Sequence, residues 1–73
     1  MPIVTIQITR EGNTPEQKSA LIKGVTDLLT DVLDKPAAST FVIIEEVELA
    51  DWGVGGVPVE EFRQREATQR SDR

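Results

Sequence analysis

The sequence predicts an α+β fold in which the chain forms one β-α-β unit followed by a short C-terminal hairpin. Three features of the 73 residues indicate this fold: an alternating apolar segment at residues 2–9, an apolar stripe at helical spacing through residues 21–32, and a β-branched run at residues 40–47. At this length we expect a single domain, residues 1–73.

The first segment, PIVTIQIT at residues 2–9, alternates with the period of two that is typical of a strand. Every second residue from Pro2 to Ile8 faces one way, and the residues between them face the other. Proline has no amide hydrogen to donate to a sheet, but it is tolerated at the first position of a strand. In a second interpretation Met1 is removed, so that the Pro2 nitrogen becomes a free secondary amine.

The next segment begins a helix after the turn REGN. Thr14 is a good N-cap, Pro15 suits the first helical position, and Gln17 completes a capping box. The helix should end near Asp34, because Pro36 disfavours helical geometry in the residue before it.

The second strand is expected at residues 40–47, TFVIIEEV, and a right-handed crossover should make it parallel to the first. The three glycines of DWGVGGVPV then indicate a tight hairpin. Residues 58–73 are expected to form a C-terminal tail, which is polar and frayed after Phe62.

Such a unit is expected to assemble with copies of itself. A two-stranded sheet with an uncovered face and open edges is not independently stable, and a chain of this length buries only roughly 60% of its unfolded surface. The chain has no cysteine, so disulfides cannot supply the missing stability. We therefore expect a homo-oligomer in which sheets join or pack across subunits.

Composition excludes several classes of function. The net charge of −5 argues against a nucleic-acid partner. No apolar run reaches membrane-spanning length and the N-terminus lacks a secretory leader, so no membrane association and a cytoplasmic location are expected. The absence of histidine and cysteine removes the usual metal ligands and the commonest general base, and no metal site is expected.

The remaining acid–base candidates are carboxylates, lysines and the terminal amine. Glu45 and Glu46 are neighbours on a strand and point to opposite faces, so they cannot share a substrate, and a solvated strand end is expected. Lys18, on the helix, is expected to face solvent. The Pro2 amine is a better candidate for a general base, because an apolar pocket and nearby cations both disfavour its protonated form.

Four features in this order resemble the 4-oxalocrotonate tautomerase family: Pro2, the helix start EGNTPEQK, the strand VIIEEV and the hairpin WGVGG. The resemblance covers residues 2 to about 57. It implies a tautomerase-like β-α-β protomer, usually assembled as a homohexamer, with the amino-terminal proline as catalytic base. It implies no metal and no organic cofactor. The activity it implies is enol–keto tautomerisation of unsaturated 2-oxo acids.

Within this resemblance, Pro2 falls on the catalytic proline. Trp52 falls on an aromatic position that forms an apolar wall around the base, although a lone tryptophan also serves as a core or interface anchor. Two substrate-binding arginines of the family are replaced, one by Asn13 and the other by Phe41. Phe41 makes the site more apolar and favours a substrate with one carboxylate.

Arg10 is the candidate that compensates for the missing arginines. It begins a turn that is one residue longer than is typical, and it is close enough in sequence to reach the same pocket. A surface charge at the turn is the other interpretation, and Arg63 or Arg65 from the tail would then be the next candidates.

The leading interpretation is therefore a cofactor-independent isomerase that acts on a small, anionic molecule and self-associates as a homohexamer or dimer. A dehalogenase, hydratase or decarboxylase relative on the same scaffold is an alternative. Val54 argues against the hydration chemistry, because the dehalogenases have a water-activating glutamate there. A non-catalytic homo-oligomer is the third interpretation.

Overall fold

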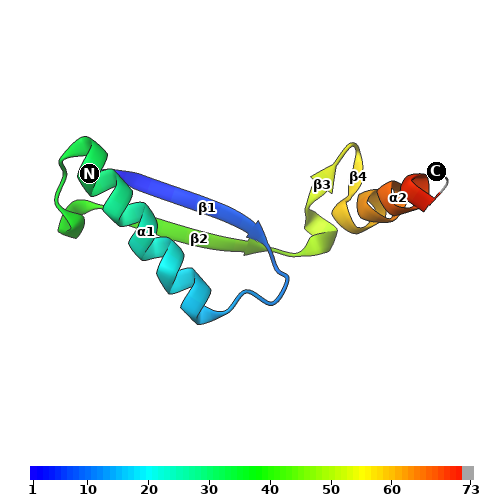
Figure 1. Ribbon diagram of the computed structural model, residues 1–73, viewed down its shortest axis with the longest axis horizontal. Helices are drawn as coiled ribbons and strands as arrows, with labels where there is room; N and C mark the ends of the chain where they lie inside the picture. Colours follow the sequence, from blue (N-terminus) through cyan, green and yellow to red (C-terminus); the bar gives the residue numbers. More distant parts are fainter. Residues whose placement is uncertain (72–73) are drawn as a thin grey trace.

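The computed structural model describes residues 1–71. The molecule is elongated, with extents of 52 × 23 × 23 Å, and Figure 1 shows a β-α-β unit continuing into an arm. Its elements in chain order are β1 (Ile3–Thr9), α1 (Pro15–Leu33), the 3-10 turn η1 (Ala37–Ser39), β2 (Phe41–Val47), the 3-10 turn η2 (Leu49–Asp51), β3 (Gly53–Val54), β4 (Val57–Pro58) and α2 (Val59–Ser71).

The β-α-β unit is the one that the sequence predicts. β1 and β2 are parallel, and their register runs from Ile3 opposite Phe41 to Thr9 opposite Val47. α1 covers one face of this sheet (Figure 1). Exposed and half-buried side chains alternate along both strands, as the period of two requires.

The ends of α1 follow from local sequence signals. The Thr14 hydroxyl accepts from the Gln17 amide at 3.1 Å, and the Gln17 side chain accepts from the Thr14 amide at 3.0 Å, which completes the predicted capping box. At the other end Asp34 has a φ of 54°, a left-handed conformation that terminates the helix.

The glycine-rich segment forms the predicted hairpin. β3 and β4 are antiparallel, with Val54 opposite Val57, and Gly55 and Gly56 between them have φ values of 62° and 88°. Two consecutive positive φ angles are what a two-residue hairpin turn needs, and glycine supplies them without strain.

The expectation of a frayed tail is wrong for most of its length, because α2 occupies Val59–Ser71. The Val59 amide donates to the Trp52 carbonyl at 2.8 Å, and its side chain is only 8% exposed. A methyl group at Gly55 would lie 3.4 Å from the Phe62 ring, which shows how closely α2 packs on the hairpin. The last two positions of the predicted tail, 72–73, lie outside the described residues.

Several large apolar side chains of the protomer are not covered by its own chain. Val59 is the one buried apolar residue among those whose burial is described. Ile3 is 64% exposed on the open face of the sheet, where Phe41 and Ile43 lie beside it, and Val32 on α1 is 71% exposed. No helix within residues 1–71 combines the length and the apolar character needed to cross a membrane.

Candidate functional site

Pro2 lies immediately before β1, at the amino end of the sheet. Its carbonyl accepts from the Phe41 amide at 2.9 Å, which fixes the residue at the start of the ladder. Phe41 pairs with Ile3 and exposes its ring on the open face. Pro2 is half-buried and Met1 before it is exposed. The structure thus brings Pro2 and Phe41, two of the four predicted site residues, to one end of the protomer.

Arg10 lies at the opposite end of the same strand. Its amide donates to the Val47 carbonyl at 2.9 Å, and its side chain forms an exposed ion pair with Glu48, with Nε 3.0 Å from Oε1. Eight residue steps separate Pro2 from Arg10, which is roughly 26 Å at the rise of an extended strand. Although the two residues are near in sequence, one protomer does not bring them together.

Trp52 also lies beyond the carboxyl ends of the strands. It follows η2, and its carbonyl accepts from Val59 while its amide donates to Leu49 at 3.3 Å. Its side chain is half-buried in the arm that holds the hairpin and α2. The four predicted site residues are therefore divided between the two ends of the sheet.

Asn13, at the position of a family arginine in the resemblance, holds the β1–α1 turn in place. Its side-chain amide donates to the Thr9 carbonyl at 2.9 Å and to Glu46 Oε2 at 3.0 Å. Lys18 Nζ lies 2.7 Å from the other oxygen of Glu46, whose side chain is only 17% exposed. The hydrogen bonds from Lys18 and then Asn13 lower the pKa of Glu46 below its ordinary value of 4.5.

The expectation that Lys18 and Glu46 both face solvent is wrong, because the two side chains pair with each other. Glu46 is on the helix-facing side of β2, and Lys18 is in the first turn of α1. Their pairing therefore depends on how α1 lies over the sheet. The signal available in the sequence was the face that alternation assigns to Glu46. Glu45 points to the other face, as predicted, and accepts from Gln7 at 3.0 Å.

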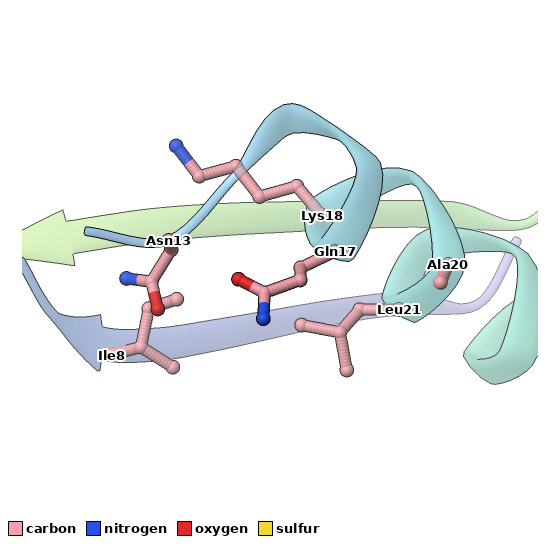
Figure 2. A pocket seen from close by; sticks show the side chains of 6 residues that line it. All are labelled: Ile8, Asn13, Gln17, Lys18, Ala20 and Leu21. Atoms are coloured by element: carbon pink, nitrogen blue, oxygen red, sulfur yellow. The ribbon is translucent and has the colours of Figure 1, made fainter. Parts of the chain in front are cut away.

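A shallow hollow of about 480 Å³ opens beside this turn (Figure 2). Figure 2 shows the side chains of Asn13, Gln17 and Leu21 extending from the turn and α1 alongside β1. The polar groups of Asn13 and Lys18 are already engaged with Glu46. The hollow lies at the Arg10 end of β1 and does not include Pro2; it is lined by Ile8, Asn13, Gln17, Lys18, Ala20 and Leu21.

The tail arginines are both paired within the protomer. Arg63 holds both oxygens of Glu11, with Nη1 2.5 Å from Oε1 and Nη2 3.3 Å from Oε2. Hydrogen bonds from Arg63 and from the Thr9 hydroxyl lower the pKa of Glu11 from 4.5 to about 2. Arg65 pairs with Glu61 one turn earlier in α2, at 2.8 Å. Neither arginine lies at the end of the sheet that holds Pro2.

The known proteins that this chain resembles in sequence are tautomerases. The tautomerase enzyme family model matches residues 2–61. A probable tautomerase K2 of Dickeya dadantii is 57% identical over 65 residues, which span 89% of this chain and 97% of that protein. A probable tautomerase of Helicobacter pylori is 46% identical over 67 residues, with 89% and 98% covered.

Solved structures agree with the sequence relatives. The crystal structure of DmpI from Helicobacter pylori matches with a TM-score of 0.80 at 46% identity, over 86% of this chain and 97% of that one. TomN, a 4-oxalocrotonate tautomerase homologue of the tomaymycin biosynthetic pathway, matches with a TM-score of 0.78 at 32% identity, over 86% and 95%.

These matches confirm the resemblance drawn from Pro2 and the three motifs, and with it the prediction of a tautomerase, an isomerase by reaction class. They extend over both long strands, α1 and the hairpin, and they include the start of α2. The chain belongs to the 4-oxalocrotonate tautomerase family of enzymes.

Proposed function

We propose that the chain is a cofactor-independent isomerase that converts the enol of an unsaturated 2-oxo acid to its keto form, with the Pro2 amine as general base. The observation that carries the proposal is the place of Pro2. Its carbonyl is held by the Phe41 amide at 2.9 Å, while its nitrogen, which has no hydrogen as an amide, stands outside the ladder. Removal of the exposed Met1 makes this nitrogen a free amine at a fixed position.

The proposal requires the neutral amine. An α-amino group is closer to neutrality in its titration than a lysine, and an apolar pocket disfavours the charged form of any amine. The neutral amine takes a proton from the enol hydroxyl or from carbon. The resulting ammonium returns a proton at the conjugated carbon, so the cycle restores the base and needs no redox partner.

A second copy of the chain completes the site in this proposal. The sheet order β1–β2 leaves one edge of β1 free, and antiparallel pairing of two such edges about a twofold axis centred on Ile6 places Arg10 of one copy opposite Pro2 of the other. Arg10 would then bind the substrate carboxylate, and Trp52 of a neighbouring copy would form an apolar wall.

The assembly of relatives supports self-association of this chain. A 4-oxalocrotonate tautomerase from Chloroflexus aurantiacus is described as a heterohexamer, and a fused 4-oxalocrotonate tautomerase as an asymmetric trimer. We propose a homohexamer or a dimer for this chain. With Phe41 at the second family arginine, we expect a substrate that carries one carboxylate.

The test uses enols of 2-oxo acids with one and with two carboxylates, and protein whose amino terminus is defined by mass. Chain that begins at Pro2 should tautomerise the monoacid, with activity rising with pH through one ionisation. Pro2→Ala keeps a primary amine and should be impaired at least tenfold without losing all activity.

The decisive control is the unprocessed chain, in which Met1 is still attached to Pro2, made by chemical synthesis and compared with synthetic chain that begins at Pro2. This protein has no amine at position 2 and should be inactive. Full tautomerase activity in a preparation proven by mass to retain Met1 would refute Pro2 as the base.

A further inference from the structure

The C-terminal helix is tied to the turn that carries Arg10. Arg63, in the second turn of α2, donates from both Nη atoms to the two oxygens of Glu11, at 2.5 Å and 3.3 Å. A guanidinium that holds a carboxylate at two points fixes orientation as well as distance, which a single-point contact does not. The pair therefore determines where the Glu11 backbone lies relative to α2.

Arg10 lies between Thr9 and Glu11, whose side chains are joined by a hydrogen bond. The Thr9 hydroxyl, at the end of β1, also donates to Glu11 Oε2. Arg10 is the residue between Thr9 and Glu11, and its own side chain is exposed. Gly12 follows with a φ of 77°, and a methyl group in place of its hydrogen would meet no atom within 4 Å, so packing at that position does not hold the turn.

The other end of the contact is firmly anchored. Val59, at the start of α2, is the buried residue of the arm, and Phe62 beside Arg63 packs against the hairpin at Gly55. α2 thus presents the Arg63 guanidinium from a fixed base. Both of its Nη groups are engaged with Glu11, so Arg63 itself has little capacity left for a substrate carboxylate.

We propose that Arg63 is a positioning residue for substrate binding: through Glu11 it holds the β1–α1 turn so that Arg10 is presented to the substrate carboxylate. This rests on the proposed function, which assigns that carboxylate to Arg10. It gives α2, which lies mostly outside the motifs that identify the family, a part in the recognition of an anionic substrate.

The test compares Arg63→Gln with Arg65→Gln in the full chain, with the monoacid enol as the probe. The control is matched, because Arg65 also forms a carboxylate pair but only within α2. Arg63→Gln should raise KM about fivefold or more with kcat changed less than twofold, whereas Arg65→Gln should leave both unchanged. Arg63→Lys, which keeps the charge without the two-point contact, should fall between wild type and Arg63→Gln.

A double variant shows whether the effect passes through Arg10. If Arg63 acts only by positioning Arg10, Arg10→Ala with Arg63→Gln should be no worse than Arg10→Ala alone. Additive losses would indicate a general structural role and overturn the proposal. An unchanged KM in Arg63→Gln while Arg10→Ala is impaired would also overturn it and would leave the proposed function intact.

A readout independent of catalysis is the titration of the Glu11 carboxyl, followed by NMR. Its pKa should rise from about 2 toward 4.5 in Arg63→Gln and remain low in Arg65→Gln. A Glu11 pKa that is the same in wild type and Arg63→Gln would remove the contact on which the proposal depends, whatever the activity of the Pro2 variants.

Discussion

Asn13, which stands at the position of a family arginine in the resemblance, has a structural role in the β1–α1 turn. The family resemblance has a charged, substrate-binding arginine at this position, whereas Asn13 uses its amide to join Thr9 to Glu46. The other oxygen of the Glu46 carboxylate pairs with Lys18 of α1, with Nζ 2.7 Å from Oε1. In this turn Asn13 therefore helps to connect both strands and the helix. In the proposed function, recognition of the anion is assigned to Arg10.

The ion pair of Lys18 and Glu46 should make stability depend on pH. Because the pKa of Glu46 is lowered in the folded protein, the unfolded chain binds more protons below about pH 4.5, and stability is lost as pH falls through the folded pKa. Lys18→Met removes the main cause of this shift. Its melting temperature should be lower than that of wild type at pH 7 and should change less on acidification.

The control for this measurement is Lys23→Met. Lys23 pairs with Asp27 on the exposed face of α1, at 2.7 Å, and exposed pairs of this kind contribute little to stability. Its melting temperature should follow the wild-type curve from pH 7 to pH 3. A Lys18→Met curve with the wild-type dependence on pH would show that the pair is not a source of acid sensitivity.

At the scale of elements, local signals were sufficient for most of the fold. Alternation predicted β1, the β-branched run predicted β2, the capping residues predicted the start of α1, and three glycines predicted the hairpin. The sequence did not predict α2, because Val59 and Phe62 are its only large apolar residues and face the hairpin rather than forming a long stripe. That helix depends on contacts that no local pattern contains.

The candidate site was also predictable only in part, because it too depends on contacts between segments that are distant in sequence. Pro2 and Phe41 lie together because the strand register places them there. The distance from Pro2 to Arg10 follows from strand length, but which chain supplies the arginine depends on assembly. The pairing of Lys18 with Glu46 requires the position of α1 over the sheet, which spacing along the chain does not fix.

The capping box of α1 gives a prediction at this scale. Thr14→Ala removes the hydroxyl that accepts from the Gln17 amide, and loss of such a cap typically costs about 1 kcal/mol of the free energy of unfolding. Urea unfolding at a fixed protein concentration should show this loss. Thr14→Ser keeps the hydroxyl and should unfold close to wild type; an equal loss in both variants would mean that the threonine methyl, not the cap, is responsible.

At the scale of the whole molecule, the prominent feature is an extended protomer with apolar surface on both sides. Ile43 lies on the open face of the sheet, 48% exposed, beside Ile3 and Phe41. Apolar surface of this kind on a short chain favours burial against another copy.

Ile43→Lys places a charge on that face and should reduce assembly. Light scattering at micromolar concentration should give a mass several times that of the protomer for wild type and a smaller mass for the variant, with tautomerase activity lost in parallel. Gln64→Lys, which adds the same charge to exposed α2, should assemble like wild type. An active, fully assembled Ile43→Lys protein would show that the open face is not an interface.

The near absence of a buried core within one protomer also bears on how the protein is made. A chain newly released from the ribosome has β1, α1 and β2 available at once, yet Val59, still 8% exposed, is the one apolar residue with described burial that it can bury alone. Maturation therefore requires encounters between chains, and its rate should depend on the square of their concentration. Slow synthesis would prolong the interval in which each chain is open to proteolysis, so the yield of enzyme should respond more steeply than linearly to expression.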